Sequence, residues 1–508
     1  MALLMGTLVA PLALAQTDPG VRGGLANQGG GLLQKGIAIP EPPVIGVNPN
    51  SGATIQPNEL ASFIEGINRA GQLESSCQAC ADIPDGSPAA GVGELDPLFP
   101  QSHTNSNGLG VGHNGDQCFV CHAQPTLGGS GGFLPPNPGV GNTPLPAENP
   151  LFRLVPNRFG KQNVVPDFEE QFGPIREVRF LTNPDGTPDG SVHQLYTIAG
   201  ITTDPTIPDC QQGQPDFAAH EASGNIAFRI PLQLFGLGLI DSIQDREIRA
   251  EFDNTATKRA ALGINGRPNL SANDNTITRF GWKAQNKSIT IFAGEAYNVE
   301  MGITNEVFPQ ATNEDPDCNG VNKPLPNDVV RTDLTDVNNA GFNNPLHILP
   351  DWLQFQLLMR FMDFPHPAAN PSASAQRGEV VFSSVGCNLC HTPLMETAPV
   401  MNSPVLQDRP VPLFSDLMLH HMGPGLADGV SQGLAGGDEF RTSLLWGVGQ
   451  RIFFLSQGQT SDLLQAIELH ASAANATYPA SEANAVIANF NKQSTTDKQA
   501  VLDFLRTL

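Results

Sequence analysis

The chain has 508 residues, about three times the usual domain length of ~150, so two or three folding units are expected. Hydrophobic residues make up 40% of the chain and charged residues only 15%, against about 25% charged in an ordinary soluble protein. The net charge of −23 argues against nucleic acid as a partner, because a polyanion is repelled by phosphate backbones.

Residues 1–15 are expected to be a signal peptide. The segment is apolar apart from Thr7, and it ends in Ala13-Leu14-Ala15, which is an A-x-A cleavage pattern. No later run approaches the ~18 apolar residues of a membrane-spanning helix, so we expect a chain that does not span a membrane. Export predicts a periplasmic or extracellular location, in an oxidising compartment.

The predicted fold is mainly α, with long loops and a few short strands. Residues 16–94 are expected to form an irregular arm and a first helix. Apolar spacing predicts helices over residues 58–73, 241–252, 350–364, 461–473 and 494–508, and short β-type runs over 177–181 and 194–198. Pro365, Pro367 and Pro371 place a boundary near residue 370.

One motif occurs twice, as Cys118-Phe119-Val120-Cys121-His122 and Cys387-Asn388-Leu389-Cys390-His391. Both are C-x-x-C-H, the spacing at which two thiols form thioether bonds to one haem and the following histidine ligates its iron. Two copies in an exported chain with only 11 histidines predict two covalently bound c-type haems.

Structural zinc and thiol redox chemistry are the other common uses of C-x-x-C pairs, and both fit these motifs less well. Structural zinc needs four closed ligands, commonly as paired C-x-x-C knuckles, and two distant motifs that each end in histidine fit this poorly. A thioredoxin-type motif would lie in a βαβ context, which neither copy has. The remaining cysteines, of which Cys77-Gln78-Ala79-Cys80 lacks a following histidine, are expected to form two disulfides, such as Cys77–Cys80 and Cys210–Cys318.

Longer stretches resemble the bacterial di-haem oxidoreductases, relatives of di-haem cytochrome c peroxidases and of the di-haem enzyme that matures methylamine dehydrogenase. The resemblance covers roughly residues 95–508. It rests on the first motif with its trailing glycines and on four further stretches, residues 279–285 (RFGWKAQ), 297–302 (YNVEMG), 420–424 (HHMGP) and 439–447 (EFRTSLLWG).

The resemblance implies two cytochrome c-like haem domains, over residues 95–370 with insertions and over 371–508. The haem held by Cys118, Cys121 and His122 would be the reactive one. The haem held by Cys387, Cys390 and His391 would pass electrons to it.

The second haem needs a distal ligand, which relatives take from a helix late in the chain. His470 falls where relatives place Met, Tyr or His, and this would make the iron low-spin. His420, His421 and Met422 are competitors, and a surface position for His470 is the ordinary alternative.

The reactive haem is expected to keep an open or weakly held sixth position. Glu300 matches the distal acid of the peroxidases, whose task is to move a proton between the two peroxide oxygens. The glutamine that accompanies this acid in relatives has no clear match, because Thr290 stands at its spacing, and Gln285 is a substitute. Trp282 matches the tryptophan that relays electrons between the haems, with core packing as the alternative.

One stretch departs from the family. Ser456-Gln457-Gly458-Gln459 replaces the His-Asp-Gly-Arg turn of close members, which removes charge beside the second haem. Arg441 and Arg451 remain as candidate partners of its propionates, or as ordinary surface ion-pairing residues.

Three functions follow. The first is a peroxidase-type enzyme that reduces hydrogen peroxide with electrons from a small donor protein, such as a cationic cytochrome or a cupredoxin. The second is an oxidase or oxygenase acting on an organic or protein substrate. The third is a pure electron carrier, in which His103, His113 or His193 would ligate the first iron. Calcium, found at the domain interface of peroxidase relatives, stays open.

Overall fold

A computed structural model of the chain describes residues 16–20, 46–47, 54–55, 59–71, 109–125, 127–131, 149–152, 155, 163–197, 212–310, 327–328, 349–399, 403 and 405–508. The predicted signal peptide, His103 and the four cysteines Cys77, Cys80, Cys210 and Cys318 lie outside these residues. The predictions made for them therefore stay predictions.

Eleven α-helices occur in the described residues. They are α1 (Glu59–Ala70), α3 (Phe217–Ser223), α4 (Leu237–Asp241), α5 (Asp245–Asn254), α6 (Ala256–Ala261), α7 (Ile289–Met301), α8 (Asp351–Phe361), α9 (Ala373–Val385), α10 (Leu463–Glu468), α11 (Asn484–Asn491) and α12 (Thr495–Leu505). None of them is both long and apolar enough to cross a bilayer.

The strands are short and mostly antiparallel. They are β1 (Gly46–Val47), β2 (Thr54–Ile55), β3 (Gly112–His113), β4 (Glu177–Arg179), β5 (Val192–His193), β6 (Tyr196–Thr197), β7 (Ala227–Arg229), β8 (Asn269–Leu270), β9 (Ile277–Thr278), β10 (Thr304–Asn305), β11 (Asn327–Asp328), β12 (Met395–Glu396), β13 (Pro410–Val411), β14 (Leu419–His421) and β15 (Glu439–Arg441). β4 lies between β5 and β7 in a three-stranded sheet. The predicted class, mainly α with long loops and few strands, is confirmed.

Several predicted helices were placed well and two were not. α1, α8 and α12 lie within their predicted ranges. The helix predicted over 241–252 corresponds to α5 but begins four residues later, at Asp245, and α4 is a separate short helix that ends at Asp241. α10 is shorter than predicted and ends at Glu468, since the next backbone bonds, such as the one from His470 N to Ile467 O, tighten the chain to i→i−3.

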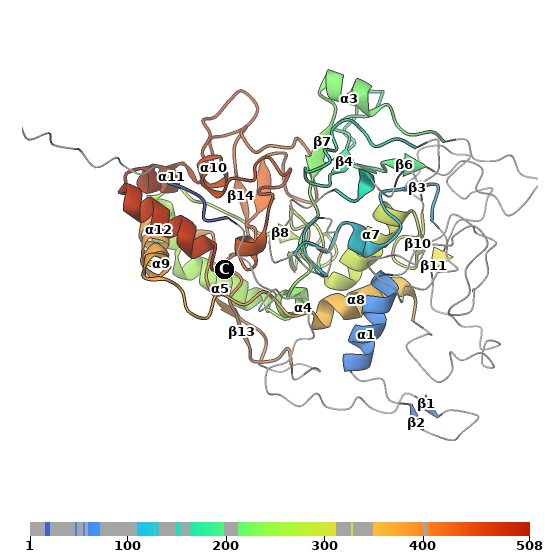
Figure 1. Cartoon of the computed structure of the whole chain (residues 1–508), viewed down its shortest axis with the longest axis horizontal. Coiled ribbons are helices and arrows are strands. Elements are labelled where there is room, and N and C mark those ends of the chain that lie inside the picture. The colour runs from blue at the N-terminus through green and yellow to red at the C-terminus, as the bar shows by residue number, and fades with distance from the viewer. Residues whose placement is uncertain are drawn as a thin grey trace, which may run out of the picture.

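The helices gather into two groups (Figure 1). α8 packs against α1, α7 and α4, while α9 packs against α12 and α11. Each group has an apolar cluster of its own, although Met395, Leu406 and Trp446 from the C-terminal part join the cluster around α4, α7 and α8. That each group forms a haem domain of its own stays a prediction.

The α9–α12 pair depends on a glycine. A Cβ on Gly378 would lie 1.8 Å from the carbonyl oxygen of Ala500 in α12, so the two backbones meet where no side chain fits. We expect Gly378→Ala to lower the free energy of unfolding by about 1–3 kcal/mol, the usual cost of overpacking. Denaturant unfolding measures this, with Gly213→Ala as control because its Cβ would meet nothing within 4 Å. Equal stabilities of the two variants would contradict the close packing.

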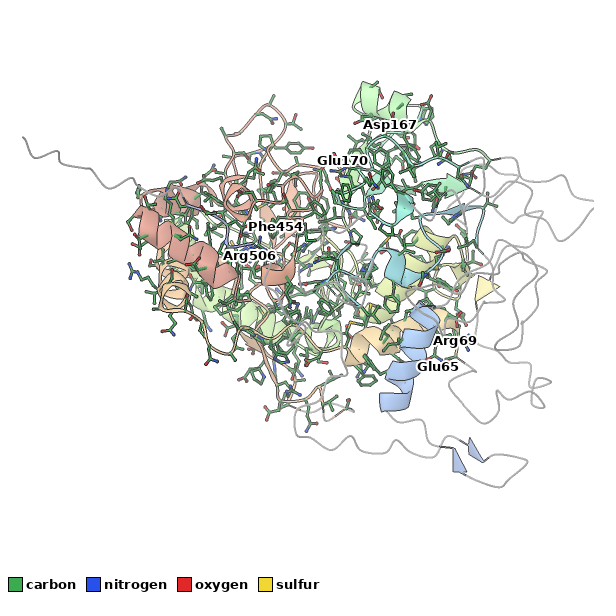
Figure 2. All side chains as sticks on the ribbon, in the orientation of Figure 1. Glu65, Arg69, Asp167, Glu170, Phe454 and Arg506 are labelled. Carbon is green, nitrogen blue, oxygen red and sulfur yellow. The ribbon has the colours of Figure 1, made fainter. Side chains whose placement is uncertain are left out.

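Ion pairs connect segments that are far apart in the sequence. Asp18, shortly after the predicted cleavage site, accepts bonds from Arg506 at 2.6 Å and from the backbone of Leu463 at 3.1 Å. The Arg506 guanidinium also lies 5.2 Å from the ring centre of Phe454 (Figure 2). The first described residues are therefore tied to both α10 and α12.

A second buried ion cluster connects β7 and the segment next to Trp282 with the C-terminal part of the chain. Asp428 binds Arg229 of β7 at 2.7 Å and the fully buried Lys283 at 3.0 Å. Burial lowers the pKa of Lys283 to about 8. This cluster holds the backbone that carries the tryptophan.

Candidate functional site

The first C-x-x-C-H motif opens onto a cavity of about 1380 Å³. The lining includes all six N-terminal residues singled out from the sequence, namely Cys118, Cys121, His122, Trp282, Gln285 and Glu300. These residues come from three parts of the chain, and the fold brings them to one enclosure.

His122 is oriented by its own loop. Cys118–Val120 forms a 3₁₀ turn, and the His122 backbone donates to Cys118 O at 3.1 Å. Its ring Nδ1–H donates to Gly129 O at 3.2 Å, the kind of bond that orients a metal-ligating histidine. Burial lowers the pKa of His122 to about 4, so the ring is neutral, as a ligand must be.

Glu300 lies in the last turn of α7, which ends at Gly302 in the left-handed conformation at φ 69°. Its carboxyl accepts a 2.8 Å hydrogen bond from Asn114 Nδ2. Burial raises the pKa of Glu300 to about 8, and the nearby Glu177 adds to this effect. Glu300 is therefore a protonated acid at neutral pH.

Gln285 and Trp282 also line the cavity. Gln285 bonds to Glu295, and its Oε1 has no hydrogen-bond partner among the described residues. Trp282 is buried, and its Nε1–H donates to Ile230 O at 2.9 Å.

The second motif opens onto another cavity, of about 1450 Å³. Cys387, Cys390, His391 and His470 all line it, and so does Trp282, which borders both cavities. The tryptophan thus stands between the two motifs in space, although it is far from either in sequence.

His391 and His470 share one arrangement. His391 Nδ1–H donates to Phe414 O at 3.0 Å, and His470 Nδ1–H donates to Ala466 O at 2.7 Å. Each ring keeps Nε2 for another bond. Burial lowers the pKa of His391 to about 4, with His470 as the next contribution, so the two rings are electrostatic neighbours.

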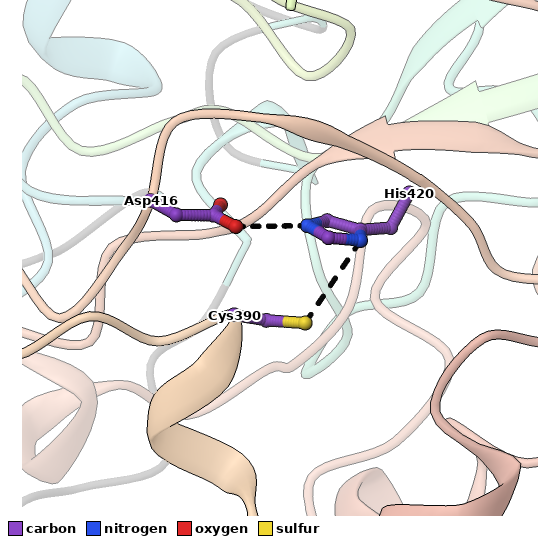
Figure 3. Close-up of side chains that lie close together, drawn as sticks. All are labelled: Cys390, Asp416 and His420. Atoms are coloured by element: carbon purple, nitrogen blue, oxygen red, sulfur yellow. Dashed lines mark hydrogen bonds and ion pairs between the residues drawn. The ribbon is translucent and has the colours of Figure 1, made fainter. Parts of the chain in front are cut away.

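The competitors of His470 differ in whether they have a free donor atom for a metal. Both ring nitrogens of His420 are engaged, Nε2 with Asp416 at 2.9 Å and Nδ1 with Glu482 at 2.8 Å. Figure 3 shows His420 between Asp416 and Cys390, whose Sγ is 3.9 Å from Nδ1. Burial opposes a charge on His420, but Cys390 and Asp416 outweigh it and raise its pKa well above the usual value. With both ring nitrogens hydrogen-bonded to carboxylates, His420 has no nitrogen left for a metal.

His421 is bound to Asp438 at 3.0 Å and does not line the cavity, whereas Met422 does. Met422 therefore remains the competitor with an available donor atom. In the described part of the chain, Cys390, Asp416 and His420 form the one cluster of three metal-ligating types, and a thiol and an imidazole do not suit calcium.

The described histidines considered for the first iron lie elsewhere. His113 is fully buried and its ring lies 6.1 Å from that of Tyr196, while His193 is bound to Asp189 at 2.8 Å. Neither lines the first cavity. The geometry therefore gives the electron-carrier interpretation no ligand from these two.

Comparison with known proteins decides the family. The model of the family described as "Di-haem oxidoreductase, putative peroxidase" matches residues 209–508, more than half of the chain. The chain belongs to the di-haem oxidoreductase family. It is accordingly an oxidoreductase of a haem-containing family, as the resemblance implied.

Two solved structures are similar over a smaller part. Hydrazine synthase of Kuenenia stuttgartiensis, solved under xenon pressure, is 17% identical over 31% of this chain and 55% of that one, with a TM-score of 0.21. A MauG-like protein associated with microbial copper homeostasis is 16% identical over 31% and 52%, with a TM-score of 0.22. The chain spans about half the length of each, and such TM-scores support no further argument. No curated protein matched.

The residues of both cavities fit the haems that the family implies. Arg441 is buried and Arg451 is half-buried where they line the second cavity, and desolvation lowers the pKa of each to about 10. Neither pairs with a carboxylate among the residues that the structure describes, and Arg451 Nη2 has no hydrogen-bond partner there. Two such guanidinium groups need anions, and haem propionates would supply them.

Three further residues of the first cavity were not predicted from the sequence. Glu177 and Arg179 project from β4, and Asn114 follows β3. Glu177 and Arg179 stand two apart in a strand, so they share a face. The spacing of Glu177 and Arg179 could have predicted an ion pair between them. No feature of the neighbouring sequence, however, links that pair to Glu300.

Proposed function

We propose that this di-haem oxidoreductase is an exported peroxidase-type enzyme that reduces hydrogen peroxide at its N-terminal haem site. The observation that carries the proposal is that Glu300, a carboxyl held neutral by burial, shares a cavity with the Cys118–His122 motif. A c-type haem bound through Cys118, Cys121 and His122 would supply the redox-active iron.

The protein's own groups would then handle protons. Reduction of hydrogen peroxide to two waters consumes two electrons and two protons. Glu300 is suited to donate one proton to the departing oxygen, because its raised pKa keeps it protonated at neutral pH. Asn114 holds the carboxyl in place through its 2.8 Å hydrogen bond.

Electrons would enter at the C-terminal site and pass Trp282. The supporting observation is that Trp282 borders both cavities and is fixed by its bond to Ile230 O. The Arg451 guanidinium lies 5.7 Å from the centre of the tryptophan ring, on the side of the second cavity. A small cationic donor protein suits the net charge of −23.

His470 is the proposed distal ligand of the second site, so His470→Met should raise the midpoint potential of that haem. Methionine ligation favours the reduced iron, and axial ligands span a range of ~0.8 V, so a rise on the order of 0.1 V or more is expected. A spectroelectrochemical titration measures it, with Met422→Leu as the matched variant. A potential that responds to Met422→Leu and not to His470→Met would assign the ligand to Met422.

The proposal is tested by electron paramagnetic resonance of the oxidised and half-reduced holoprotein, with and without peroxide. A high-spin signal that peroxide removes, beside a low-spin signal that His470→Ala abolishes, is the expected result. Two low-spin signals that ignore peroxide in both states would overturn the peroxidase assignment and leave an electron carrier.

A further inference from the structure

Glu177 is a second carboxyl of the first cavity that lies outside every sequence motif. It is the first residue of β4, the central strand of its sheet, whereas Glu300 ends α7. Both side chains line the cavity, and they are hydrogen-bonded to each other. The fold thus joins two carboxyls that are far apart in the sequence.

The pair is asymmetric in its partners. Glu177 Oε1 lies 2.7 Å from Arg179 Nε in an ion pair, whereas Glu300 receives a neutral amide donor, Asn114 Nδ2, at 2.8 Å. A hydrogen bond between two carboxyls requires that one of them carry the proton. The cation beside Glu177 and the neutral donor beside Glu300 leave the proton mainly on Glu300.

Both carboxyls are only partly buried, and both line the cavity. The Glu177 side chain keeps 21% of its surface exposed and that of Arg179 keeps 10%, while Glu177 Oε1 itself is buried. Desolvation is the largest cause of the raised pKa of Glu300. A proton that enters at Glu177 is one hydrogen bond away from Glu300.

The remaining charged groups of the cavity have other partners. Arg229 is bound to Asp428 at 2.7 Å, Arg176 donates to Phe168 O, and Glu295 receives Asn286 and Gln285. Among the described residues, Arg179 is therefore the cation that forms an ion pair with Glu177.

We propose that Glu177 and Glu300 form a proton-sharing pair, in which Glu177 is the positioning residue that returns a proton to Glu300 after each use. The proposal rests on the proposed function. Glu300 gives its proton to the departing peroxide oxygen and becomes a carboxylate. A proton from solvent then binds Glu177, and its transfer across the shared hydrogen bond restores neutral Glu300 and ionised Glu177.

The test is an infrared pH titration of the holoprotein that follows the band of the protonated carboxyl, which Glu300→Gln must remove. In Glu177→Gln the loss of a neighbouring negative charge should move the midpoint of this band downward by about one pH unit or more. In Arg179→Gln the loss of the cation should move it upward. Glu221→Gln, at an exposed position on α3, is the matched control and should leave it unchanged.

Activity supplies a second readout. The pH at which peroxide reduction falls on the alkaline side should move with the infrared midpoint in both variants. An infrared midpoint that ignores both Glu177→Gln and Arg179→Gln would overturn the pairing. A wild-type protein that shows the paired titration but does not consume peroxide would instead overturn the proposed function, so the two failures are distinguishable.

Discussion

Replacing Glu300 with glutamine should lower the rate of peroxide reduction by about 10²–10⁴-fold, the usual contribution of a positioned acid or base. Glutamine keeps the shape of the side chain and can still accept from Asn114, but it has no proton to donate. The measurement is steady-state peroxide consumption by the holoprotein with a reduced small donor, with Glu221→Gln as control.

The role of Glu300 as an acid also predicts in which direction the activity changes with pH. Because burial raises the pKa of Glu300 to about 8, the acid form is present below that pH and is lost as the pH rises through it. Wild-type activity should therefore decline on the alkaline side near pH 8. A glutamine variant that keeps wild-type turnover and the same decline would show that another group is the acid.

Removing one pair of motif cysteines should remove one haem and leave the other. Cys118→Ala with Cys121→Ala should leave a single covalent haem and no peroxide consumption, because His470, as proposed above, would occupy the distal position of the remaining site. Cys387→Ala with Cys390→Ala should also leave a single covalent haem, but one that still reacts with peroxide. Each double variant serves as the control of the other.

The measurement is the mass of the denatured chain, together with haem absorbance after acidic solvent extraction. Thioether bonds survive this extraction, whereas a haem held only by its iron ligand is released. Release of haem from the wild-type chain would contradict covalent attachment. An unchanged haem count in both double variants would contradict the assignment of the motifs.

Local sequence patterns predicted some helices closely and others not. α12 was predicted closely because Ser494 caps its first turn, through a 3.0 Å bond to Asp497 N, and its apolar residues repeat at helical spacing. The short helix α4 was not predicted; its Leu239 and Ile240 are buried against other parts of the chain. A helix of five residues is too short for apolar spacing to reveal it.

The candidate ligands show the same limit. Three of the late residues, His420, His421 and Met422, were equivalent competitors of His470 in sequence. In the folded chain, Asp416 and Glu482 bind both ring nitrogens of His420, and Asp438 binds His421. Met422 has no such partner among the described residues and remains the competitor of His470. Ion pairs between residues as distant as His420 and Glu482 follow from the folded chain and have no local pattern.

The sequence by itself established the two C-x-x-C-H motifs from which the haem chemistry was predicted, the helical class and the acidic charge, because each depends on spacing within a few residues or on composition. Only the tertiary structure decided that Trp282 borders both cavities, that Arg441 and Arg451 line the second cavity without an acid partner among the described residues, and that Glu177 meets Glu300. These features join segments separated by a hundred residues or more, and the closure of such distant contacts is set by the packing of the whole core.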